Sequence, residues 1–193
     1  MQNRNRYQTL LWRALCVLPT VYCLLPTTRS SASANAVVPA RTGGFGEMTC
    51  HQCHSQNPLN EPAGRLTLSG IPATYTPGER YLITVAVAHP QLVRAGFQVS
   101  ARFETGGNAG MFTASDVRTE AIPDDGGRIT YIQHSSAGAD PPQPGAGRWT
   151  FEWTAPSGAS GPVLFHLAAN AANGDGLSRG DFIYTATARS GGP

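Results

Sequence analysis

After residue 64, hydrophobic and polar residues alternate with a period of two along most of the chain. The clearest runs are 97–103 (FQVSARF) and 149–154 (WTFEWT), in which every second residue is apolar. This alternation is typical of strands with one face in a core and the other outside it. Further candidate strands are 65–69, 81–88, 111–113, 128–134, 163–170 and 181–188. Seven or eight short strands separated by turn residues predict an all-β fold, an antiparallel β-sandwich over 65–189.

The aromatic residues of the second run share one face. Trp149, Phe151 and Trp153 alternate with polar residues. The simplest interpretation of such a stripe is core packing.

Residues 37–64 lack any sustained period and are rich in glycine and proline. They predict an irregular arm before the sandwich. Residues 1–36 have the pattern of a signal peptide: early arginines, a short apolar run at 14–25, and a small-x-small site at Ala34-Asn35-Ala36. We therefore expect a periplasmic or secreted protein whose mature chain begins at Val37, with a leader retained as an N-terminal anchor as the alternative. No second apolar stretch follows, so we expect no membrane span in the mature chain.

The arm contains Cys50-His51-Gln52-Cys53-His54, and C-x-x-C-H is the attachment signature of a c-type haem. Two thiols at this spacing can form thioethers with the two vinyl groups of one porphyrin. The histidine after the second thiol is then placed to ligate the iron. The motif predicts one covalent haem c on Cys50 and Cys53, with His54 as the proximal ligand.

Two other interpretations of the motif stay open. A disulfide between Cys50 and Cys53 would close a very small loop and leave His54 without a role. Zinc could use the two thiols, His54 and one distant histidine.

The second axial ligand decides what a haem can do. His134 is the first candidate, because it ends a predicted strand at a loop edge. Met111 and His166 are the alternatives, and an open position is another. His166 alternates with apolar residues and is expected to face solvent. His51 and Met48 are constrained by the attachment loop, and His89 is expected to be a solvated loop residue.

The distribution of charged residues argues against two classes of binding partner, nucleic acids and anionic membranes. Four of the 14 basic residues precede residue 37, so ten arginines oppose 12 acidic residues and residues 37–193 carry a formal charge of −2. The chain has no lysine. A basic surface for nucleic acid and a polybasic membrane-binding cluster are therefore not expected.

The chain resembles the choice-of-anchor V domain proteins, a group of exported bacterial proteins related to Reeler-like sandwiches. The resemblance runs from about Gly43 to Thr187 and is carried by GEMTCHQCH, YTPGERYLITVAV, AGFQVSA, YIQHSSAG, WTFEWTAP, AANAANGDG and SRGDFIYT. It implies an immunoglobulin-like or Reeler-like sandwich and a surface role. This chain differs in lacking a C-terminal anchoring segment after Gly191-Gly192-Pro193, and in having His166 where the family has an aromatic residue.

The leading functional hypothesis is an exported monohaem c-type cytochrome that passes single electrons to a redox protein partner. The alternative is a binding or surface-architecture module whose haem is structural or sensory. An enzyme such as a peroxidase is not expected, because no acid–base constellation is evident. Asn173-Gly174-Asp175-Gly176 is first a turn, with calcium as a second interpretation.

Overall fold

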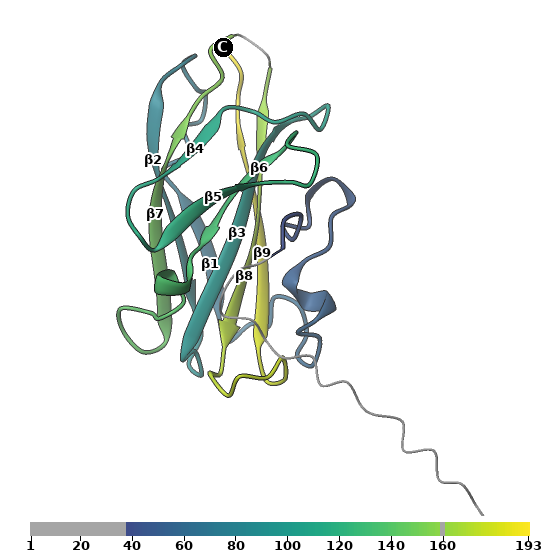
Figure 1. Ribbon diagram of the computed structural model, residues 1–193, viewed down its shortest axis with the longest axis vertical. Helices are drawn as coiled ribbons and strands as arrows, with labels where there is room; N and C mark the ends of the chain where they lie inside the picture. The colour runs from purple at the N-terminus through teal and green to yellow at the C-terminus, as the bar shows by residue number, and fades with distance from the viewer. Residues whose placement is uncertain (1–37, 159–160) are drawn as a thin grey trace, which may run out of the picture.

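A computed structural model of the chain describes residues 38–158 and 161–193, and these form two antiparallel sheets packed face to face (Figure 1). The four-stranded sheet has the order β1 (Arg65–Ser69), β2 (Arg80–Ala88), β7 (Ala146–Thr154), β4 (Met111–Ala114). The five-stranded sheet has the order β5 (Thr119–Pro123), β6 (Thr130–His134), β3 (Arg94–Phe103), β8 (Val163–Ala172), β9 (Phe182–Ser190). The predicted antiparallel β-sandwich is confirmed. No helix among the described residues is long and apolar enough to cross a membrane.

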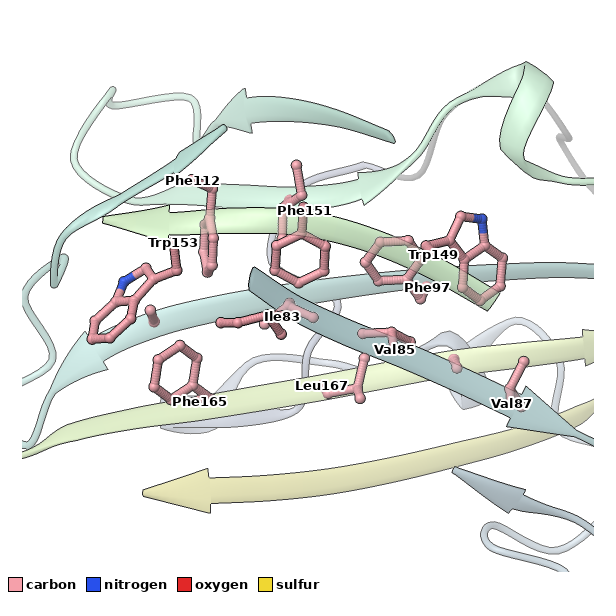
Figure 2. Close-up of a cluster of buried hydrophobic side chains, with 14 of the residues drawn as sticks. Ile83, Val85, Val87, Phe97, Phe112, Trp149, Phe151, Trp153, Phe165 and Leu167 are labelled. Carbon is pink, nitrogen blue, oxygen red and sulfur yellow. The ribbon is translucent and has the colours of Figure 1, made fainter. Parts of the chain in front are cut away.

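The core lies between the sheets and is dominated by aromatic rings (Figure 2). Trp149, Phe151 and Trp153 are at most 2% exposed, which confirms that their stripe is core. Trp153 meets Phe165 edge to face at 4.9 Å, and Phe97 stacks on Phe151 at 5.9 Å. The rings from the two sheets therefore interlock across the interface, as expected for sandwich packing.

Strand β5 was not predicted. Its sequence, TEAIP, has one large apolar residue and ends in Pro123, so it carries little strand signal. The strand pairs only with β6, at the edge of the sheet. This segment is a strand because it pairs with β6, and its own sequence of hydrophobic and polar residues does not indicate one.

The polar face of β3 is buried, although the alternation predicted one face outside the core. Gln98 and Ser100 are fully buried and Arg102 is 7% exposed. The arm covers this outer face of the five-stranded sheet. Figure 1 shows the arm, in dark blue, alongside that sheet and away from β2, β7 and β4. The arm is irregular, as predicted, apart from the 3-10 turns η1 (Gly44–Gly46) and η2 (Cys50–Gln52).

Side-chain hydrogen bonds replace strand pairing where the arm begins. Oε1 of the Gln98 side chain accepts a hydrogen bond from the main-chain N–H of Arg41 at 2.7 Å. Nε2 of the same side chain donates to the main-chain carbonyl of Val38 at 3.1 Å. Gln98 Nε2 also donates to Gln133 Oε1 at 3.0 Å. The buried side-chain amide of Gln98 thus pairs with the Arg41 N–H and the Val38 carbonyl, which would otherwise lack hydrogen-bond partners.

The central contact of the arm is the carboxylate of Glu47. It forms an ion pair with Arg102 and accepts hydrogen bonds from the hydroxyls of Tyr131 and Thr42, each at 2.6 Å. The Glu47 and Arg102 side chains are each 9% exposed. Burying a charge is costly unless it is paired and hydrogen-bonded, and these contacts meet that condition.

The arm after the motif caps the free edge of β9. Asn60 donates its main-chain N–H to the Ile183 carbonyl at 2.9 Å, and its side-chain oxygen accepts the N–H of Thr185 at 2.8 Å. Asn60 has φ of 58°, a left-handed conformation that asparagine tolerates. The contact occupies part of a strand edge that would otherwise be open.

We expect Glu47→Ala to destabilise the protein by about 3–5 kcal/mol, because it leaves the Arg102 charge buried without a partner. Urea denaturation measures this loss. The matched control is Arg80→Ala, which breaks the exposed pair of Arg80 with Glu152 at 3.8 Å and should cost about 1 kcal/mol or less. Equal losses in the two variants would show that the buried pair does not hold the arm.

Candidate functional site

The C-x-x-C-H motif folds as a single turn. Thr49 caps η2 in a reciprocal capping box with Gln52, whose side-chain oxygen accepts the Thr49 N–H at 2.6 Å. The N–H groups of Cys53 and His54 both donate to the Cys50 carbonyl, at 3.2 and 3.0 Å. The turn therefore gathers both thiols and the imidazole into one short segment, and η2 packs next to β8.

His54 is oriented by a buried carboxylate. Its Nδ1 lies 2.6 Å from Oδ2 of Asp181, whose side chain is 1% exposed. Because an ionised carboxylate only accepts hydrogen bonds, Nδ1 is the donor in this contact, and Nδ2 of Asn170 lies 3.4 Å from the same nitrogen. In a neutral imidazole of this tautomer, Nε2 keeps its lone pair. A carboxylate on the far nitrogen is the usual support of a histidine that ligates a metal.

Asp181 is itself held on both carboxylate oxygens. Asn170 Nδ2 donates to Oδ2 at 3.2 Å, and the main-chain N–H of Asn173 donates to Oδ1 at 3.1 Å. Asn57 Nδ2 donates to the Asp181 carbonyl at 2.9 Å, which joins the arm to the start of β9. Sequence analysis missed Asp181. It lies 127 residues from His54, and its one signal was an acidic residue opening the last predicted strand.

The two thiols differ in their surroundings. Cys50 is half-buried, Cys53 is exposed, and both are free in this structure. Burial raises the pKa of the Cys50 thiol to about 11. In the absence of a bound group, desolvation thus keeps the Cys50 thiol protonated. Among the described residues, no group of three or more histidine, cysteine or acidic side chains converges to hold a metal ion, so the zinc hypothesis gains no support.

His134 lies at the end of β6, where its ladder with β3 stops. The paired residues are Gln98–Ser100 and Tyr131–Gln133, and beyond them His134 Nδ1 accepts the Phe97 N–H at 3.1 Å. A Cβ on Gly96 would lie 2.5 Å from the His134 ring, so only glycine fits beside it. Gly96 pairs with Asn170, which contacts Asp181. His134 therefore lies in the sheet that carries the His54 network, two strands away.

Burial also lowers the pKa of His134. Its imidazole is consequently neutral at neutral pH, which is the form that ligates metals.

Met111 lies far from the motif in the fold. It belongs to β4 at the edge of the four-stranded sheet, on the other side of the sandwich from the arm (Figure 1). Its side chain is 59% exposed, while the neighbouring Phe112 is buried. Met111 is therefore not core filler, and the structure does not bring it to His54.

His166 does not face solvent, contrary to the prediction. It lies on the face opposite the apolar residues of β8, as expected, but the arm covers that face. Its ring meets Phe45 edge to face at 5.2 Å, and a Cβ on Gly44 would lie 2.4 Å from it. Nδ1 of His166 is buried without a hydrogen-bond partner in the described part of the chain. Burial, helped by the nearby charge of Arg102, lowers its pKa.

His89 was expected to be solvated and is buried instead. It is 4% exposed and stacks on Phe182 with ring centroids 3.7 Å apart. In the attachment loop, His51 Nε2 lies 3.0 Å from the Asn57 carbonyl.

The loop from Asn173 is a turn held by its own side chains. Both carboxylate oxygens of Asp175 accept hydrogen bonds, one from the Leu177 N–H at 2.8 Å and one from Asn173 Nδ2 at 3.2 Å. This supports the turn interpretation rather than a calcium loop.

Comparison with known proteins identifies the fold. No protein-family model and no curated protein matches the chain. The Reelin-N domain of F-spondin matches with a TM-score of 0.50 at 21% identity, covering 74% of this chain and 96% of that one. The reeler domain of human F-spondin gives 0.47 at 22%, covering 72% and 96%. The chain is a Reeler-like β-sandwich. At this identity the likeness shows the fold alone.

The lowered pKa of His166 predicts a pH-dependent stability. The unfolded chain takes up a proton near the ordinary pKa of about 6.5, whereas the folded protein resists it, so stability should fall as pH drops from 7 to 5. His166→Phe removes this group and should make the unfolding free energy less dependent on pH in that window. Urea denaturation at pH 8, 7, 6 and 5 measures it. Parallel curves for the two proteins would contradict the assignment.

Proposed function

We propose that this protein is an exported monohaem c-type cytochrome that transfers single electrons to a protein partner. The haem would be attached through thioethers on Cys50 and Cys53, with His54 as the proximal ligand. The observation that carries the proposal is the hydrogen bond from His54 Nδ1 to the buried carboxylate of Asp181. In the neutral ring this contact would leave Nε2 free to ligate iron, and it is the support that metal-ligating histidines usually have.

The surroundings of the motif suit the group. Bound haem would supply a one-electron redox centre. A thioether carries no charge, so it suits the desolvated position of Cys50 better than a thiolate does. Phe45 and Met48, just before the motif, are 42% and 53% exposed. Such apolar side chains beside the attachment turn are suited to cover a porphyrin face.

For the second axial position we keep His134. It lies in the same sheet as the His54 network. Ligation through Nε2 would need the tautomer in which Nδ1 carries the proton and donates it to the Phe97 carbonyl at 3.3 Å, because a neutral ring whose Nδ1 accepts the Phe97 N–H carries its proton on Nε2. Met111 lies on the other sheet, and His166 is enclosed by Gly44 and Phe45.

Export completes the proposal, because haem c is attached outside the cytoplasm in bacteria. The predicted signal peptide and its cleavage before Val37 lie outside the described residues. A periplasmic or secreted location and a redox protein partner are thus proposed from the sequence. The membership of the choice-of-anchor V group likewise stays a proposal.

The alternative function is a binding or surface-architecture module with a structural or sensory haem. The Reeler-like fold is compatible with it, because a sandwich of this kind does not by itself indicate a chemistry. Binding of carbon monoxide to the reduced protein distinguishes the two. Rapid stoichiometric binding would favour the sensor, and resistance to binding would favour a six-coordinate carrier.

Covalent haem is the first expectation of the proposal. Expression with its leader in a host with cytochrome c maturation should give denatured protein whose mass is the polypeptide plus one haem. Cys50→Ser and Cys53→Ser should each leave at most one thioether, and the double variant should lose the haem on denaturation. Bare wild-type polypeptide, or polypeptide that carries zinc, would overturn the proposal.

A variant of the second ligand should change the spectrum without releasing the haem. His134→Ala is expected to convert a low-spin spectrum to a high-spin one, because the iron loses one axial ligand while both thioethers remain. Met111→Leu and His166→Phe are the matched controls and should keep the wild-type spectrum. An unchanged spectrum for His134→Ala would show that another group, or none, occupies that position.

A further inference from the structure

Haem attachment alone does not explain the carboxylate behind His54. Asp181 directly precedes β9, is 1% exposed, and has both carboxylate oxygens engaged. A main-chain carbonyl could orient an imidazole at less cost, because it carries no charge to desolvate. A buried charge at this place therefore has a consequence beyond orientation.

That consequence is electrostatic. A carboxylate that accepts the Nδ1 proton of His54 makes the imidazole a stronger electron donor through Nε2. A stronger donor stabilises the more highly charged, oxidised iron and lowers its reduction potential. The effect is strengthened here because Asp181 itself is shielded from water, with a side chain that is 1% exposed.

We propose that Asp181 is a positioning residue that fixes the Nδ1-protonated tautomer of His54 and holds the reduction potential of the bound iron low. The inference rests on the proposed function. Asn170 tunes it, since its Nδ2 donates to the same Oδ2 of Asp181 at 3.2 Å, takes up part of the carboxylate's negative charge, and lies 3.4 Å from His54 Nδ1.

The main variant is Asp181→Asn, which preserves shape and removes the charge. The asparagine amide has only one oxygen, so it cannot accept hydrogen bonds from both His54 Nδ1–H and the Asn173 N–H. The matched control is Asp175→Asn, which makes the same charge change in the same loop without contact to His54.

Spectroelectrochemical titration of the holoproteins tests the inference. For Asp181→Asn we expect at least a tenfold shift of the equilibrium toward the reduced form, which is about 59 mV upward for one electron. Asp175→Asn should keep the wild-type potential. Asn170→Ala should shift the potential the opposite way, because it leaves more of the carboxylate's charge on His54.

A second readout does not need haem. In the haem-free protein, the strongly hydrogen-bonded Nδ1–H of His54 should give a downfield proton resonance that Asp181→Asn abolishes and Asp175→Asn retains. If Asp181→Asn does not fold, the inference is tested by the reduction potential of Asn170→Ala and by the presence of this resonance in the wild-type protein.

Failure of the proposed function and failure of the inference about Asp181 give different experimental results. A wild-type protein that takes up no haem overturns the proposed function. Haem-loaded Asp181→Asn at the wild-type potential, an equal shift in Asp175→Asn, or an upward shift in Asn170→Ala overturns this inference and leaves the proposed function standing.

Discussion

The buried carboxylate of Glu47 is the contact on which the candidate site depends. Its partner Arg102 points from β3 onto the outer face of the five-stranded sheet, where an uncovered strand would place it in solvent. Pairing lets the arm cover that face without leaving a charge unmatched. Because Glu47 lies three residues before Cys50, this ion pair fixes the chain on the N-terminal side of the attachment turn.

The arm is also fixed after the turn. Asn57 donates to the carbonyl of Asp181, and Asn60 continues the attachment along the edge of β9. With anchors on both sides, a five-residue motif in an irregular segment acquires a defined orientation. The hydrogen bond of His54 to Asp181 depends on this double attachment, since it joins a loop to a strand that folds from the other end of the chain.

A Reeler-like sandwich does not by itself indicate a chemistry. Its core of interlocking aromatic rings would serve a receptor module or a scaffold equally well. The proposed redox function is argued from the outer surface instead, where glycine at positions 44 and 96 leaves room for histidine rings and a buried aspartate contacts a third histidine. In that proposal the fold supplies rigidity and the arm supplies the haem attachment motif.

The sequence by itself determined the sandwich, the aromatic core and the motif, because each is a local pattern: a period of two, a stripe on one strand, a spacing of three. It predicted neither strand β5 nor the burial of His89 nor the partial burial of His166, since these depend on what packs over them. Only the tertiary structure brought Asp181 to His54. A hydrogen bond across 127 residues leaves no trace in local spacing, and it forms only when the arm has folded onto the outer face of the sheet.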